Sequence, residues 1–198
     1  MREPERDPAA SPQLLRAGGV GAVLAGSLFV AWGYLDQKNA PPYFYALAHA
    51  LALIVPALFM LGLAALYLRC AGRTTRFGEA GIILGLIGSA LGASRALIRM
   101  AVPSLYLHNA LSVGTLLLLG VWTPTLFVGL LLAGVALAAT RTLKGLGALL
   151  LVMGASGWIY YVTDSDAILE ARSIHVGFGL LFSLGWIVLG LTLWFAEP

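Results

Sequence analysis

A series of long apolar runs restricts the fold of this chain more than any other sequence feature. Five of the runs are long enough to cross a bilayer as helices, which takes about 20 apolar residues. They cover residues 17–34, 43–68, 77–101, 146–162 and 174–195. Charged residues make up 11% of the chain, whereas soluble domains contain about 25%. The sequence therefore predicts an all-α, polytopic integral membrane helix bundle.

Residues 105–140 form one further apolar segment that is too long for a simple span. It has no charged residue apart from His108, and as one helix it would measure roughly 50 Å against about 30 Å of hydrocarbon. One interpretation is a long tilted helix that kinks at Pro124. The alternative is a tight turn at Trp122–Thr125 between two short spans, because a Thr-Pro pair is a helix-start signal.

The distribution of basic residues between the loops decides between six and seven spans. With six spans and a cytoplasmic N-terminus, eight Lys and Arg residues fall on the inner side and four on the outer side, whereas seven spans give seven and five. Because Lys and Arg concentrate in cytoplasmic loops, we predict six transmembrane helices, with seven as the alternative. Residues 1–13 are expected to form a disordered cytoplasmic tail, and residues 14–198 a single transmembrane helical domain in the plasma membrane.

A ridge of glycines marks the expected third span. Gly81, Gly85, Gly88 and Gly92 follow one another at steps of four, three and four residues, so they share one face of a helix. Small residues let helix backbones approach each other closely in lipid. We therefore expect this glycine ridge to pack against another helix and not to face the bilayer.

Two arginines, Arg95 and Arg99, continue the glycine ridge toward the end of the same span. An arginine at the centre of a membrane helix costs roughly 2.5–3.5 kcal/mol on insertion scales, so each needs a compensating environment. Three interpretations stay open: side chains that extend to the headgroups, salt bridges to the loop acids Asp164 and Asp166, and a site for a ligand.

Six spans place all three histidines and both arginines at the outer ends of the helices. Polar groups at membrane depth are a functional hypothesis by default. We therefore predict an outward-facing pocket that binds a small ligand, which would be anionic, quinone-like or haem. The predicted lining residues are His49, Arg95, Arg99, His108 and His175.

No spacing signature supports a particular cofactor. A b-type haem could be ligated by His49 and His175, with Gly177 and Gly179 making space beside the second histidine. A metal ion held by three histidines would lack any pair spaced by three or four residues on one helix. The metal content is therefore left unassigned, and haem is one option among the ligands.

The remaining sequence narrows the function classes. Cys70 is the one cysteine, which excludes internal disulfides and paired-thiol chemistry. No G-x-S-x-G, H-E-x-x-H or Walker-type motif occurs, so the sequence leans away from an enzyme without deciding the question. No basic stretch is suited to nucleic acid.

Two further interpretations stay open beside a ligand-binding protein. The first is a non-catalytic subunit or assembly factor of a membrane complex, because nearly the whole chain consists of spans. The second is a small transporter that acts as an oligomer, since Pro56, Pro124 and the two arginines interrupt otherwise apolar spans. The expected partners are the lipid bilayer and either other membrane subunits or further copies of the chain.

Overall fold

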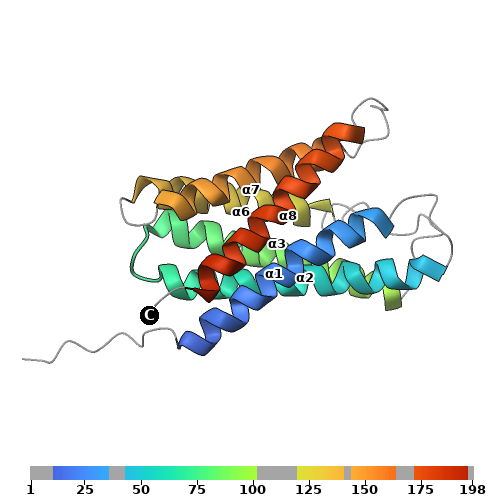
Figure 1. Ribbon diagram of the computed structural model, residues 1–198, viewed down its shortest axis with the longest axis horizontal. Coiled ribbons are helices and arrows are strands. Elements are labelled where there is room, and N and C mark those ends of the chain that lie inside the picture. Colours follow the sequence, from blue (N-terminus) through green and yellow to red (C-terminus); the bar gives the residue numbers. More distant parts are fainter. Residues whose placement is uncertain (1–10, 36–42, 102–119, 141–143, 164–171, 196–198) are drawn as a thin grey trace, which may run out of the picture.

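The computed structural model describes residues 11–35, 43–101, 120–140, 144–163 and 172–195. Within these residues the chain forms six helices and no strands, labelled as in Figure 1: α1 (Pro12–Leu35), α2 (Tyr43–Cys70), α3 (Arg76–Ala101), α6 (Trp122–Ala139), α7 (Lys144–Thr163) and α8 (Arg172–Trp194). Each of the six is long and apolar enough to cross a membrane. The prediction of a multi-pass membrane bundle with six spans is confirmed.

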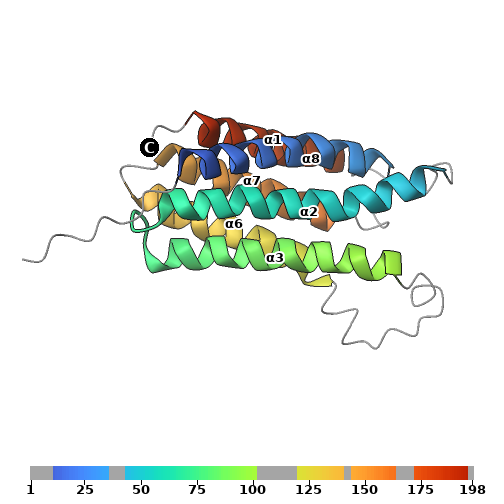
Figure 2. The same ribbon diagram turned by 90° about the horizontal axis from the view of Figure 1, so that it is seen from below.

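The six helices form a closed ring in chain order (Figures 1 and 2). Each helix packs against the one before it and the one after it, and α8 closes the ring against α1. Neighbouring helices run antiparallel, so α1, α3 and α7 end where α2, α6 and α8 begin. We call this the histidine end, because it holds His49 of α2 and His175 of α8. We call the opposite end the basic end, because it carries Arg16, Arg69, Arg73 and Arg76.

The glycine ridge of α3 packs against α6, as its spacing predicted. All four glycines of the ridge are buried. A Cβ on Gly88 would lie 2.5 Å from the backbone nitrogen of Leu126 and 2.9 Å from the carbonyl oxygen of Trp122. The two helix backbones therefore touch at positions where no larger residue fits without moving them apart.

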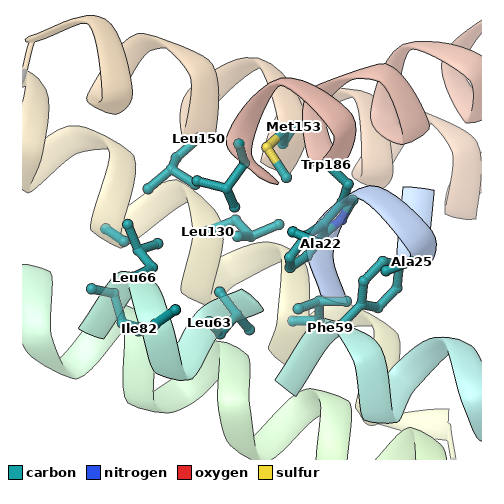
Figure 3. Packing of buried hydrophobic residues seen from close by; sticks show 14 of the residues in the cluster. Ala22, Ala25, Phe59, Leu63, Leu66, Ile82, Leu130, Leu150, Met153 and Trp186 are labelled. Carbon is teal, nitrogen blue, oxygen red and sulfur yellow. The ribbon is translucent and has the colours of Figure 1, made fainter. Parts of the chain in front are cut away.

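Aromatic side chains from four helices fill the interior of the ring. Phe59 of α2 stacks on Trp186 of α8 with ring centroids 4.3 Å apart, and both side chains are fully buried. Phe182 of α8 meets Phe29 of α1 and Phe127 of α6 edge-on. Figure 3 shows Phe59 and Trp186 among the aliphatic residues of the core. In the part of the chain that the structure describes, the middle of the bundle is thus packed core.

The start of α1 lies inside the segment that the sequence predicted to be tail. Ser11 precedes Pro12, and Ser11 Oγ accepts a hydrogen bond from the Leu14 amide at 3.4 Å. This is an N-cap serine followed by proline in the first helical position, where a missing N–H costs nothing. Pro12 and Gln13 therefore belong to the helix, and residues 1–10 lie outside the described residues.

Helix α6 starts within the ambiguous apolar segment. The helix begins at Trp122 and not earlier in the chain, and Pro124 lies in its first turn. A proline is tolerated there because the first amides of a helix have no helical acceptor. The Thr-Pro pair therefore starts a helix as its chemistry favours, and the two interpretations of residues 105–140 otherwise differ in residues that lie outside the described part of the chain. His108 lies in residues 102–119, which are outside the described part of the chain.

Helix α8 runs diagonally between its two neighbours. Near the basic end it lies against α1, where a Cβ on Gly19 would be 2.7 Å from the carbonyl oxygen of Gly190. Near the histidine end it lies against α7, where a Cβ on Gly179 would be 3.0 Å from the ring of Tyr160. A Cβ on Gly33, at the same end of α1, would meet only the Tyr160 hydroxyl at 3.7 Å and no atom of α8. Figure 1 shows α7 and α8 converging at the upper right and separating toward the lower left.

Candidate functional site

His175 lies in the first turn of α8 and links it to the end of α7. Its Nδ1 is 3.1 Å from the carbonyl oxygen of Tyr160, which belongs to the last turn of α7. The last four carbonyls of a helix have no backbone amide partner within that helix, and this one also accepts a hydrogen bond from Thr163 Oγ1 at 3.1 Å. Because a carbonyl oxygen can only accept, Nδ1 carries a proton and donates it. In the neutral imidazole, Nε2 is then the nitrogen with the lone pair.

The imidazole of His175 is also held by an aromatic ring. Tyr160 stacks on it with ring centroids 4.0 Å apart and an interplanar angle of 25°. Phe29 of α1 meets the Tyr160 ring edge-on at 5.5 Å, and Thr163 Oγ1 lies 3.4 Å from Nδ1. The hydrogen bond and the stack together fix both the protonated nitrogen and the orientation of the ring, as a binding contact requires.

A pocket of about 140 Å³ lies beside His175, between α1, α7 and α8. Its lining residues are Phe29, Val30 and Gly33 of α1, Tyr160 of α7, and His175, Val176, Gly179 and Leu180 of α8. The walls are apolar apart from the imidazole and the tyrosine. A cavity of about 150 Å³ holds one benzene ring, so this pocket has room for one ring of a ligand.

The pocket opens sideways, toward the outer surface of the bundle. Val30, Val176 and Leu180 form its rim and are 42%, 50% and 45% exposed. Such apolar surface on a membrane-spanning helix faces lipid tails. The opening exists because α8 leans away from α1 at this end and because Gly33 and Gly179 bring no side chain into the space. A ligand would therefore reach His175 from the bilayer.

Of the five predicted site residues, His175 is the one that lines this pocket. His49 of α2 and Arg95 of α3 are half-buried near the same end of the bundle, on the other side of the ring. The side chain of Arg99 and the whole of His108 lie outside the described residues. The convergence of all five on one ligand stays a prediction, whereas the pocket geometry concerns His175 alone.

The sequence reasoning missed the partners of His175. Tyr160 contributes its backbone carbonyl, and because every residue has one, the sequence does not indicate it. Phe29 and Gly33 did leave a signal, because an aromatic residue and a glycine four positions apart share one helix face. Such a pattern is typical of a pocket wall, in which the aromatic ring lies beside the space that the glycine leaves, yet it is also common in ordinary helix packing.

Two buried indole groups adjoin the pocket wall. Nε1 of Trp32 in α1 and Nε1 of Trp122 in α6 have no hydrogen-bond partner among the described residues. Their rings lie 6.4 Å apart, and Trp32 also packs edge-on against Phe29 at 5.8 Å. An unpaired buried donor costs about 1–3 kcal/mol, so an acceptor that reached either indole would remove that cost.

The described residues offer little material for metal binding or covalent catalysis. No group of three His, Cys, Asp or Glu side chains comes together in them. The buried hydroxyls of Ser89, Ser156 and Ser183 each donate to a carbonyl of their own helix. Such hydroxyls are satisfied structural groups and not poised nucleophiles.

Comparison with family models, curated proteins and solved structures finds no match for the chain.

Proposed function

We propose that this multi-pass membrane protein binds a small amphiphile from the bilayer in the pocket beside His175. The ligand has one ring that carries a hydroxyl or carbonyl oxygen, as in quinols and quinones. The proposal is carried by the pocket itself, which has apolar walls, a lipid-facing rim and one imidazole oriented by Tyr160. Apolar pockets with a few fixed polar groups are the usual form of a ligand site.

The protonation of His175 favours one form of such a ligand. With Nδ1–H donated to the Tyr160 carbonyl, the neutral imidazole presents Nε2 as an acceptor. A ring hydroxyl can donate to that nitrogen, whereas a ring carbonyl needs the imidazolium form. A quinol should therefore bind the neutral imidazole more tightly than the corresponding quinone does. The apolar tail of the ligand would leave between Val30 and Leu180 and remain in the lipid.

The size of the pocket selects among the predicted ligands. Pockets that enclose a whole drug-sized ligand or cofactor measure about 300–1,000 Å³, while the space beside His175 is about 140 Å³. A single ring suits this volume better than haem does. An anionic ligand at Arg95 and Arg99 is a separate prediction, because Arg95 does not line this pocket and the side chain of Arg99 lies outside the described residues.

The test is calorimetric titration of the protein in nanodiscs with decylubiquinol and, separately, decylubiquinone. We expect saturable binding that is tighter for the quinol. His175→Asn keeps an N–H donor for the Tyr160 carbonyl but lacks Nε2, so it should weaken quinol binding by about tenfold to a hundredfold, which corresponds to one strong hydrogen bond. His49→Ala is the matched control and should bind like the wild type. If both histidine variants bind normally, the proposal fails and a non-catalytic subunit becomes the better interpretation.

The same proposal includes an orientation in the plasma membrane. The basic end holds Arg16, Arg69, Arg73, Arg76 and Lys144, whereas the half of the bundle toward the histidine end holds Arg95, Arg99 and Arg172. This excess favours a cytoplasmic location of the basic end. The pocket beside His175 would then lie in the outer half of the bilayer. A cysteine placed at Gly72, in a background without Cys70, should react with a membrane-impermeant maleimide only after the cells are opened. Labelling of this cysteine in intact cells would mean that the basic end lies outside the cell.

A further inference from the structure

We propose that the groove between α7 and α8 at the basic end binds an anionic phospholipid, with an acyl chain in the groove and the phosphate on Arg69. This second site lies at the opposite end of α8 from His175 and does not depend on the ligand proposed for that pocket. Three features support it: an apolar groove between the two helices, a helix path that keeps this groove open, and a guanidinium bonded to one of its lining residues.

The groove is apolar and large enough for a hydrocarbon chain. It encloses about 540 Å³ and runs along α7 from Gly145 to Val152, roughly 10 Å at 1.5 Å per residue. Val188 and Thr192 of α8 form its other wall. Because these residues belong to membrane-spanning helices, the groove is open to lipid tails and not to water. Acyl chains surround the protein in the bilayer, and one that fills the groove would restore the dispersion contacts that the groove walls lack.

The groove follows from the diagonal path of α8. Close contact between Gly19 and Gly190 holds the basic end of α8 against α1 and away from α7. On the α7 side, a Cβ built on Gly145 would meet no atom within 4 Å. The paths of the α7 and α8 backbones therefore create the groove, and small side-chain movements would not close it.

The guanidinium of Arg69 is bonded to a residue that lines this groove. Arg69 Nη1 donates to the carbonyl oxygen of Thr192 at 2.8 Å, and Thr192 is a lining residue. A guanidinium has five N–H donors in a planar fork that suits phosphate oxygens, so one bond to Thr192 positions it and leaves donors for an anion. Glu79 is the one acidic residue in the part of the chain that the structure describes, so the basic end favours an anionic headgroup.

The shape of the groove argues for a lipid instead of a second copy of the chain. A partner helix has a diameter of about 10–12 Å with its side chains and would need small residues along a longer stretch. Here the small residues are confined to Gly145 and Ala148, and Val152 follows one turn later. A single narrow chain that ends in a phosphate satisfies both the length of the groove and the charge of Arg69.

Native mass spectrometry tests this proposal with two lipids that share the same acyl chains, phosphatidylglycerol and phosphatidylcholine. The delipidated full chain should bind phosphatidylglycerol about tenfold more tightly than phosphatidylcholine. Ala148→Phe should fill the groove and weaken the binding of both lipids. Ala155→Phe places the same ring on the same exposed stripe of α7, two turns away and outside the groove, and should leave both unchanged.

The charge of Arg69 is tested separately. Arg69→Gln should remove the preference for phosphatidylglycerol, Arg69→Lys should keep most of it, and Arg73→Gln, in the exposed turn after α2, should change nothing. If Ala148→Phe and Ala155→Phe weaken lipid binding equally, the lipid does not bind in the groove. If Arg69→Gln and Arg73→Gln reduce the preference for phosphatidylglycerol equally, Arg69 does not bind its phosphate. Conversion of a dimer to a monomer by Ala148→Phe, with lipid binding intact, would make a second copy the occupant and overturn the proposal.

Discussion

Replacing Gly88 with leucine is expected to cost the protein most of its folded stability. A Cβ at this position would lie 2.5 Å from the Leu126 amide nitrogen and within 3 Å of the Trp122 carbonyl, so α3 and α6 must move apart along the whole glycine ridge. Overpacking a tight interface costs about 1–3 kcal/mol, and we expect about 3 kcal/mol here because backbone atoms cannot rotate away. Thermal unfolding in detergent, followed by circular dichroism, measures the loss.

Gly177→Leu is the matched control for this substitution. A Cβ on Gly177 would meet no atom within 4 Å, and leucine favours a helix over glycine by up to about 1 kcal/mol. The control should therefore be as stable as the wild type or slightly more stable. Equal unfolding temperatures for Gly88→Leu and Gly177→Leu would mean that α3 and α6 do not touch at the glycine ridge.

Replacing Gly33 with phenylalanine is expected to abolish ligand binding while leaving the fold intact. Gly33 lines the pocket beside His175, and its Cβ would meet only the Tyr160 hydroxyl at 3.7 Å. The new ring would occupy a space of about 140 Å³ that we assign to the ring of the ligand. We expect decylubiquinol binding to weaken by well over tenfold, more than about 1.4 kcal/mol, with an unchanged unfolding temperature.

This substitution separates binding from folding in a way that His175 variants cannot. His175 also caps the end of α7, so its loss affects stability as well as ligand contact. Gly177→Phe adds the same ring to an open position two residues after His175 and should bind normally. Normal decylubiquinol binding by Gly33→Phe would place the ligand elsewhere, and the half-buried His49 and Arg95 would become the next residues to test.

The parts of the fold that the sequence predicted correctly depend on patterns within single helices. Apolar runs of sufficient length gave six spans, since lipid requires each of them to satisfy its own backbone. The glycine ridge of α3 predicted a partner helix, because a stripe of four glycines allows close contact between helix backbones and gives no advantage where it faces lipid. Both inferences need only the periodicity of an α-helix.

The starts of helices were harder to predict, because a local signal was available but was outweighed by hydropathy. Ser11-Pro12 is a cap followed by a first-turn proline, yet the polar residues around it suggested a tail. Pro124 was open to two interpretations, and the Thr-Pro start signal proved more informative than the length of the apolar segment. Helix ends are set by hydrogen bonds of a few residues, which an average over a long window conceals.

The pocket beside His175 could not have been predicted from the sequence. It depends on the diagonal path of α8, which brings Tyr160 to His175 at one end and Gly19 to Gly190 at the other. That path is a sum of contacts between helices far apart in the chain. The prediction that polar residues gather at one end needed only the alternation of antiparallel spans, so it could name His175 but not its neighbours.

The most direct test of the central claim is ¹⁵N NMR of the histidine side chains in nanodiscs, with and without decylubiquinol. The chain has three histidines, so His175 can be assigned from the spectrum of His175→Asn. We expect a protonated Nδ1 in both states, and an Nε2 lone-pair resonance that moves when Nε2 accepts a hydrogen bond from the quinol hydroxyl. A proton on Nε2 with none on Nδ1 would contradict the hydrogen bond from Nδ1 to the Tyr160 carbonyl. An Nε2 resonance that does not change when the quinol is added would mean that His175 does not contact the ligand.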